Sequence, residues 1–284
     1  MTDAELAPAA SPAPAPATDP PILAAVGVTV RFGGVMALDQ VSLAVPRGST
    51  VGLVGPNGAG KTTLFGVLSG LLRPRSGHVT MDGADVTRRT PNWRAARGLS
   101  RTFQRMELFT ELTVREHLVV ARRVREGRQR FFGFFRDLSG LGERPAPGEE
   151  EAVENVLELL GLQAVADRPA VSVPLGTGRL VEVGRALAAE PVVMLLDEPS
   201  SGLDGHETEQ LGEALRRVRQ ERAVALVLVE HNVEFVLDLS DRVTVLDFGR
   251  VLTEGTPAEV RDSPEVQEAY FGAPVDTNQH EDTP

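Results

Sequence analysis

Cysteine is absent from this chain of 284 residues, and lysine, tyrosine and tryptophan occur once each. Without cysteine the protein forms neither disulfides nor thiolate metal sites, which suits the cytosol. No apolar run approaches the roughly 20 residues of a membrane-spanning helix. The formal charge of −11 argues against a nucleic-acid binder that depends on neutralising phosphates. The chain is long enough for one large domain or two modest ones.

Both ends of the chain differ in composition from its middle. Residues 1–21 alternate Ala and Pro and lack the basic and continuous apolar regions of a secretory signal. We expect this segment to be a disordered tail that favours polyproline II. The acidic residues 273–284 are expected to form a second disordered tail, which leaves 22–272 as the folded domain.

The first part of that domain has the pattern of β-structure. Apolar residues alternate at Val26, Val28, Val30 and Phe32, as in a strand with one buried face. Asp82-Gly83 marks a hairpin turn between two further strands. An antiparallel β-subdomain is therefore expected at the N-terminal end.

Helix signals dominate from about residue 90 to residue 190. Thr90 is placed as an N-cap before a proline, with Gly98 as the glycine that ends the helix. Thr113 and Glu116 have the spacing of a capping box. A later helix places apolar residues on one face, at positions 153, 156, 157 and 160. We expect a helical subdomain over about 105–190.

Two apolar strands flank an amphipathic helix in the last third of the chain. The strands are "PVVMLLDEP" (191–199) and "AVALVLVEH" (223–231), and the helix is "HETEQLGEALRRVRQE" (206–221). Fully apolar strands that alternate with amphipathic helices indicate a parallel sheet covered on both faces. The predicted fold class is α/β.

A glycine-rich loop between a predicted strand and a predicted helix carries the first chemical motif. It fits the pattern GxxxxGK[ST], in which backbone N–H groups surround phosphates at a helix N-terminus. The expected nucleotide-binding residues are Gly55, Pro56, Asn57, Gly58, Ala59, Gly60, Lys61, Thr62 and Thr63. Lys61 is the only lysine, although the other 28 basic residues are arginine. A slot beneath the β- and γ-phosphates suits a compact ammonium better than a broad guanidinium.

The second motif is a pair of acids that ends an apolar strand. Asp197 is expected to assist Mg²⁺ together with the hydroxyl of Thr62, and Glu198 to orient and deprotonate an attacking water. An ordinary acidic pair at a strand end is the alternative. The P-loop in the same chain favours the catalytic interpretation.

These motifs, followed by "SGLD" and by a histidine after the next apolar strand, resemble the nucleotide-binding subunits of ATP-binding-cassette (ABC) transporters. The resemblance covers about 22–272. It implies a P-loop NTPase of the ABC-ATPase type, with a mostly parallel core sheet, an N-terminal antiparallel β-subdomain and a helical subdomain. It also implies an ATPase that uses ATP and Mg²⁺.

The resemblance gives roles to four further residues. Phe32 matches the aromatic residue that stacks on adenine, although packing in the core is the alternative for a strand phenylalanine. Gln104 matches the glutamine that reaches Mg²⁺ and the attacking water. His231 matches the histidine that contacts the γ-phosphate, with a purely structural histidine as the alternative. Asp204 ends a loop that contacts the opposite subunit.

One segment departs from the family pattern. The Leu-Ser-Gly-Gly-Gln signature of the family falls on Val173-Pro174-Leu175-Gly176-Thr177, and only Gly176 matches. Pro174 removes a serine hydroxyl that, in the family, binds the γ-phosphate held by the other subunit. The helix-terminal amides near Gly176 and the helix dipole remain as binding groups. We expect a weakened but usable signature, with a non-hydrolysing site as the alternative.

The resemblance also implies partners. Because one chain has one P-loop and one signature, a second ABC subunit, identical or related, completes each ATP site. "GLSRTFQRMELFTELTVREHLVVA" and the C-terminal region look most like branched-chain amino-acid importers, which implies permease subunits, an indirectly coupled solute-binding protein, and a place on the cytoplasmic face of the membrane. The alternatives are a soluble ABC ATPase acting on DNA or ribosomes and a weakly hydrolysing regulatory module.

A segment of mixed Arg and Phe residues interrupts the helical region. Its members are Arg122, Arg123, Arg125, Arg128, Arg130, Arg136, Phe131, Phe132, Phe134 and Phe135. One hypothesis is a surface that docks on the permease or on the anionic bilayer. A helix that packs its Phe residues and exposes its Arg residues is the alternative.

Overall fold

The computed structural model describes residues 20–102, 106–125 and 147–271. Of the two predicted tails, residues 1–19 and 273–284 therefore lie outside the described residues. Within the described ranges, no helix is both long and apolar enough to cross a membrane. The described elements run from Leu23 to Phe271.

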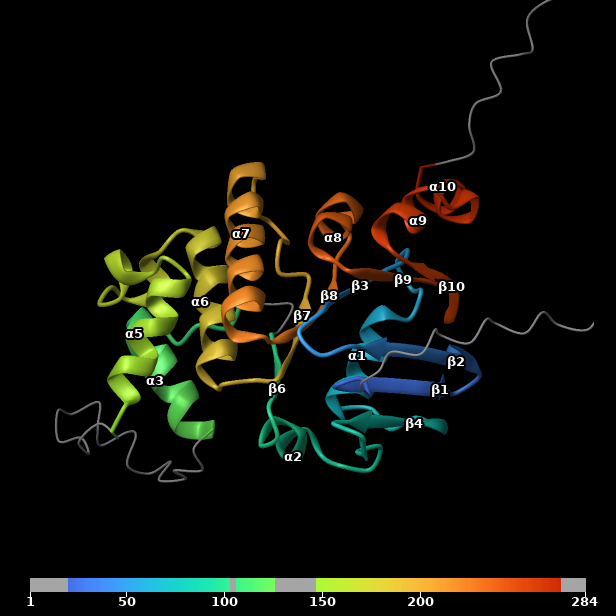
Figure 1. Ribbon diagram of the computed structural model, residues 1–284, viewed down its shortest axis with the longest axis horizontal. Coiled ribbons are helices and arrows are strands. Elements are labelled where there is room, and N and C mark those ends of the chain that lie inside the picture. The colour runs from blue at the N-terminus through green and yellow to red at the C-terminus, as the bar shows by residue number, and fades with distance from the viewer. Residues whose placement is uncertain (1–19, 103–105, 126–146, 272–284) are drawn as a thin grey trace, which may run out of the picture.

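A six-stranded sheet forms the centre of the molecule (Figure 1). Its order is β10-β9-β3-β8-β7-β6, and β10 alone runs antiparallel, to β9. The strands are β3 (Thr50–Val54), β6 (Leu99–Arg101), β7 (Val193–Asp197), β8 (Ala225–Val229), β9 (Arg242–Asp247) and β10 (Arg250–Gly255). The mostly parallel α/β sheet predicted from the apolar strands is confirmed.

The central strands are buried on both faces, because helices pack on one face and α1 together with N-terminal β-strands covers the other. In β7, Val193 and Leu195 belong to one apolar core, and Met194 and Leu196 to the other. This division follows from the alternation of side chains along a strand. It explains why the sequence of β7 is continuously apolar.

An antiparallel sheet of order β2-β1-β4-β5 forms the N-terminal β-subdomain at one end of the molecule. Its strands are β1 (Leu23–Phe32), β2 (Val35–Val45), β4 (Ser76–Met81) and β5 (Ala84–Asp85). The predicted turn at Asp82-Gly83 is confirmed, with both residues at positive φ.

The predicted alternation along β1 is wrong at its ends. Val28 and Val30 are buried, but Val26 is 43% exposed and Phe32 is 52% exposed. The register of β1 shifts repeatedly, and Gly27 adopts φ +57°. A bulge of this kind turns the residues on its two sides toward different faces, so period-2 counting fails across it.

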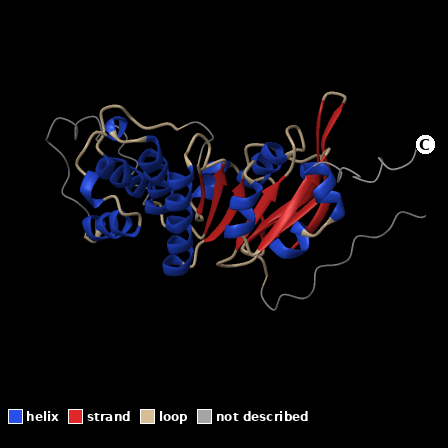
Figure 2. Cartoon of the chain, turned by 90° about the horizontal axis from the view of Figure 1, so that it is seen from above, coloured by secondary structure: helices blue, strands red, loops and turns tan. Residues whose placement is uncertain are grey.

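The helices divide into those on the sheet and those at the far end (Figure 2). The helices are α1 (Lys61–Ser69), α2 (Pro91–Ala95), α3 (Val114–Arg125), α5 (Glu149–Leu159), α6 (Leu175–Ala188), α7 (Gly205–Arg222), α8 (Val233–Leu239), α9 (Pro257–Arg261) and α10 (Pro264–Phe271). Helices α3, α5 and α6 form a group away from the β-subdomain (Figure 1). Residues 126–136 of the Arg/Phe segment lie outside the described residues.

The helix caps follow the sequence signals closely. Thr90 accepts a hydrogen bond from Trp93 N, with proline at the next position, and Thr113 and Glu116 form both bonds of a capping box. The prediction that Gly98 directly follows the C-cap of α2 is wrong by one residue. The C-cap is Ala96, and Gly98 takes φ +95° two positions later.

Candidate functional site

The glycine-rich loop leaves the end of β3 and enters α1. Gly58 and Gly60 adopt φ +84° and +107°, a left-handed region that favours glycine. A Cβ on Gly60 would lie 2.7 Å from Ala37 O of β2, so the close approach of the β-subdomain also requires glycine there. Helix α1 has no side-chain cap and no acidic residue in its first turn. Its N-terminal amides and the positive end of its dipole are therefore suited to an anion.

Lys61 folds back over this loop. Its ammonium donates hydrogen bonds to the carbonyl oxygens of Gly55 and Pro56, at 3.1 Å for Pro56. The residue is only 6% exposed. Burial lowers the pKa of Lys61, and the nearby Glu198 and Asp197 oppose that shift. The loop thus carries a compact, enclosed cation beside an uncapped helix end, which is the arrangement that phosphates require.

The predicted acid pair lies at the end of β7. Glu198 adopts φ +49°, a strained conformation for a residue with a Cβ and one that is concentrated at functional sites. Its Oε1 lies 2.8 Å from Nε2 of His231, which follows β8. The side chain of Glu198 is 13% exposed and that of His231 is 50% exposed. The structure therefore brings these two predicted residues into direct contact.

Strand order explains why these groups meet. Strands β3, β8 and β7 are parallel neighbours, so their carboxyl ends lie at one edge of the sheet. The glycine-rich loop follows β3, His231 lies just beyond β8, Asp197 ends β7, and Glu198 follows it. Ligands bind outside the carboxyl ends of strands in open α/β sheets.

Arg101, which was not singled out in the sequence, contacts the predicted metal-binding carboxylate. Its Nη2 lies 2.8 Å from Oδ2 of Asp197, and both side chains are largely buried. Arg101 ends β6, the neighbour of β7. Its placement depends on the pairing of two strands distant in sequence, which left no local signal.

Glu230 is the second residue that was missed. It is 3% exposed and accepts hydrogen bonds from the backbone N–H groups of Ser200, at 2.6 Å, and His231, at 3.2 Å. Burial raises the pKa of Glu230 against the effect of these bonds. The side chain ties the loop after Glu198 to the loop that carries His231. A carboxylate directly after an apolar strand was the available signal.

The roles of two other predicted residues stay predictions. Phe32 is half exposed at the end of β1, so the alternative that it packs in the core is wrong; its contact with adenine stays a prediction. Gln104 follows β6 but lies outside the described residues, and its role also stays a prediction.

The predicted signature lies elsewhere, at the start of α6 in the helical group (Figure 1). Pro174 is the N-cap of α6 and gives no side-chain hydrogen bond. The N–H of Gly176 donates to Oε1 of Glu207, at 3.1 Å. Asp204 is the N-cap of α7, and its Oδ1 accepts from Glu207 N at 2.8 Å. The contacts of Gly176 and Asp204 with a nucleotide stay predictions.

The oxygen ligands at this edge of the sheet suit Mg²⁺, which is held partly by substrate phosphates, better than they suit a metal ion held by protein side chains alone. Asp197 supplies a buried carboxylate, and Thr62 an exposed hydroxyl at the start of α1. No group of three or more acidic, His or Cys side chains suited to a metal occurs among the described residues. Mg²⁺ is commonly held by one or two such oxygens together with substrate phosphates.

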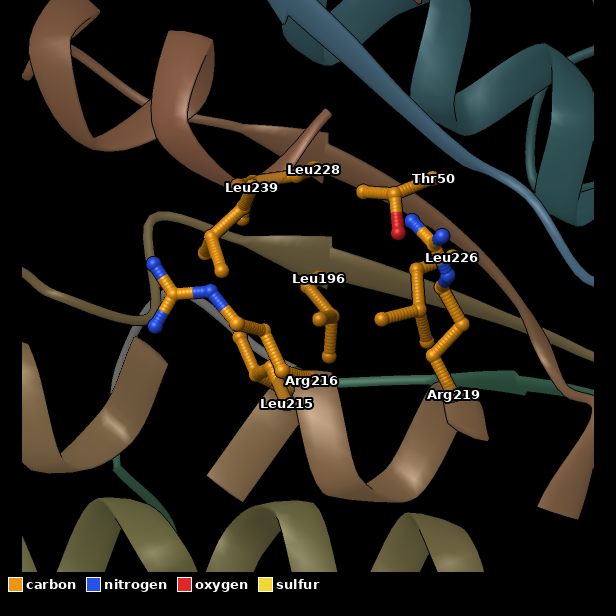
Figure 3. Close-up of a pocket in the computed structure, with 8 residues that line it drawn as sticks. All are labelled: Thr50, Leu196, Leu215, Arg216, Arg219, Leu226, Leu228 and Leu239. Atoms are coloured by element: carbon orange, nitrogen blue, oxygen red, sulfur yellow. The ribbon is translucent and has the colours of Figure 1, made fainter. Parts of the chain in front are cut away.

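A cavity beneath α7 is too small to be the nucleotide-binding site (Figure 3). Its volume is about 10 Å³, which is space for a single water at most. Arg219, in its wall, pairs with Asp241 at 2.9 Å, and Asp241 accepts from Thr50 N at 2.8 Å. This region joins α7 to the sheet.

Comparisons with known proteins agree with this geometry. Residues 38–201 match the ABC transporter family model, and residues 250–276 match the model for branched-chain amino acid ATP-binding cassette transporters. The chain is 38% identical over 257 residues to the high-affinity branched-chain amino acid transport ATP-binding protein BraF of Pseudomonas aeruginosa, covering 89% of this chain and 98% of BraF. LivG of Escherichia coli K12, which bears the same description, is 36% identical with the same coverage.

Solved structures of ATP-binding cassettes are also similar to this chain. A nucleotide-free ATP-binding cassette from an ABC transporter superimposes with a TM-score of 0.72 at 31% identity, covering 89% of this chain and 99% of that one. An ATP-binding cassette in its ADP conformation gives 0.73 at 31% identity, with the same coverage.

Proposed function

Because the chain belongs to the ABC transporter family, we propose that it is the ATP-hydrolysing subunit of an importer for branched-chain amino acids or related small solutes. The protein is an ABC-type ATPase domain, and its relatives are ATP-binding proteins of transport systems. The match of residues 250–276 to the branched-chain amino acid family supports the choice of solute. No comparison favours a soluble ATPase or a regulatory module.

The convergence of three loops at one sheet edge is the observation that carries this function. The amides of residues 57–63 and the ammonium of Lys61 bind the phosphates. The hydroxyl of Thr62 and the carboxylate of Asp197 would hold Mg²⁺, which would supply positive charge to the β- and γ-phosphates. Arg101, which pairs with Asp197 at 2.8 Å, supplies a counter-charge beside this carboxylate.

Glu198 and His231 perform the chemical step. Glu198 accepts a proton from a water whose oxygen attacks the γ-phosphorus, and the bond from that phosphorus to the ADP oxygen breaks. His231, in contact with Glu198, orients the carboxylate and faces the γ-phosphate. Gln104 would contact the attacking water and the metal ion, and Phe32 would stack on adenine.

Assembly supplies the remaining contacts. A second ABC subunit, identical or related, presents its residues equivalent to Gly176 and Asp204 to this nucleotide. Closure of the pair drives permease subunits in the membrane, with the ATPase on the cytoplasmic face and a solute-binding protein outside. We assign 22–272 to the ATPase domain and about 105–190 to its helical subdomain.

Hydrolysis by the purified protein and by its Glu198→Gln variant tests the proposal. We expect the variant to bind ATP with unchanged affinity and to lose hydrolysis. Co-purification with a multispanning membrane protein is expected for the native complex. ATP binding without hydrolysis in that complex would contradict the proposed function.

A further inference from the structure

Helix α6 begins without a side-chain cap from its own N-cap residue. Serine, threonine, aspartate and asparagine cap helices by accepting a hydrogen bond from an early N–H, whereas the N-cap here is Pro174, with no side-chain cap bond. The N–H of Gly176, at the second helical position, donates instead to Oε1 of Glu207, at 3.1 Å. A carboxylate from the next helix thus replaces the missing cap.

Glu207 connects the N-termini of two helices. It is the third residue of α7, and its Oε2 accepts a hydrogen bond from Asp204 N at 3.3 Å in a capping box. Its other oxygen reaches Gly176 of α6. Both helix dipoles favour a negative charge at this point.

The packing around this carboxylate is close. A Cβ on Gly176 would lie 2.8 Å from Oε1 and 2.9 Å from both Cδ and Cγ of Glu207. A side chain at position 176 would displace Glu207. The one residue of the segment that keeps the family pattern is therefore also required by this contact.

Two independent contacts join the same segments. Nη2 of Arg179, on α6, donates to Ser201 O at 3.2 Å. A Cβ on Gly202 would lie 3.3 Å from Cδ2 of Leu175, so Leu175 packs directly against that glycine. The start of α6 and the loop before α7 consequently form one connected block.

We infer that Glu207 is a positioning residue for the signature segment, residues 173–177: it holds the start of α6 and occupies the Gly176 amide that a partner-bound γ-phosphate requires. The inference rests on the proposed function, which places that phosphate at Gly176. Carboxylate and phosphate are both anions, and one N–H cannot serve both well. Closure therefore requires Oε1 to leave Gly176, while Oε2 stays on Asp204, and Glu207 sets the equilibrium of closure.

The first test measures ATP-dependent association in the Glu198→Gln protein by light scattering over a range of protein concentrations. Adding Glu207→Ala is expected to lower the concentration for half association by about tenfold or more, since each dimer contains two such contacts. Glu207→Gln keeps an acceptor without its charge and should lie between. Glu209→Gln, an exposed residue on the same helix, is the matched control and should change nothing.

The result that overturns the inference is association that Glu207→Ala leaves unchanged or weakens, or association absent from every variant. Binding of a fluorescent ATP analogue, measured on the same samples, separates this outcome from failure of the proposed function. If no variant binds the analogue, the function is wrong; if all bind it equally and the order of association differs from that expected, only the inference is wrong.

A second measurement on the nucleotide-free monomer does not depend on association. Amide hydrogen exchange at Gly176 should be slow in the native protein, similar in Glu207→Gln and faster in Glu207→Ala. Exchange that is the same in all three proteins would show that Glu207 does not hold this amide, and would overturn the inference.

Discussion

The N-termini of α1 and α6 differ in the charged group that lies beside their first backbone N–H groups. Neither has a side-chain cap of its own, since α1 follows Gly60 and α6 follows Pro174. At α1 the neighbouring charge is the ammonium of Lys61, and no acid lies in the first turn. At α6 a carboxylate from Glu207 takes an amide. One end is thus prepared for an anion that comes from solution, whereas the other carries an internal anion.

The largest expected effect separates chemistry from binding at the α1 end. Glu198→Gln should lower the hydrolysis rate by about 10²- to 10⁴-fold, because the water loses its general base, and should leave ATP affinity unchanged. Steady-state phosphate release and nucleotide binding measure the two quantities. A comparable loss of hydrolysis in Glu209→Gln would show that the effect is not specific to the site.

The next effect tests why the α1 end uses lysine. Lys61→Arg should weaken ATP binding by about 10- to 100-fold, as expected when hydrogen bonds to a charged group are lost, since the broad guanidinium does not fit the enclosed position that Lys61 occupies. Calorimetric titration with Mg-ATP measures it. The exposed Arg217→Lys exchange is the control. Unchanged binding in Lys61→Arg would remove the physical reason for this lysine.

A smaller effect tests whether Glu207 replaces a missing cap at the α6 end. Glu207→Ala should lower the free energy of unfolding by about 0.5–2 kcal/mol, the usual cost of losing a cap. Adding Pro174→Ser should restore the part of that loss that belongs to α6, because serine caps its own helix, and not the part from the Asp204 contact in α7. Urea unfolding of the two single variants and the double variant gives the answer. Additive effects would contradict the replacement.

The smallest expected effect is a loss of folding stability at acidic pH. His117 is buried in its neutral form: Nε2 accepts from Phe109 N at 2.9 Å, and Nδ1 donates to Thr113 O at 2.8 Å. Burial lowers its pKa, so between its native and unfolded pKa values the unfolded chain binds more protons. Stability is therefore complete above about pH 6.5, the unfolded value, and is lost as pH falls through the native pKa.

We expect this loss of stability at acidic pH to arise in the part of the molecule that packs on α6. The segment supported by His117 packs on α6, where Glu107 N donates to Glu182 at 3.4 Å. The His117→Gln variant should show a shallower decrease in the free energy of unfolding between pH 7 and pH 5. A slope identical to that of the native protein would exclude His117 as its source.

Local patterns in the sequence predicted most of the fold and one half of the site. The glycine-rich loop, the acid pair and the N-caps at Thr90 and Thr113 depend on neighbours within a few residues, and the structure places them where the sequence predicted. The alternation along β1 failed because a bulge at Gly27 leaves no period to count. Gln104 and the Phe132/Phe135 region remain predictions.

The residues that were missed act across long sequence distances. Arg101 reaches Asp197 through strand pairing, and Glu207 reaches Gly176 through helix packing. Pro174 was interpreted as the loss of a hydroxyl that binds the γ-phosphate, and no local pattern indicated which group caps α6 in its place. The capping carboxylate of Glu207 lies 33 residues further along the chain, and only the packing of α6 against α7 brings it to Gly176.

Amide hydrogen exchange of the native monomer with and without Mg-ADP tests the contrast between the two helix ends most directly. The account predicts new protection across residues 57–63 and none at Gly176, which Glu207 already protects. Protection by ADP at Gly176, or none across the glycine-rich loop, would contradict it.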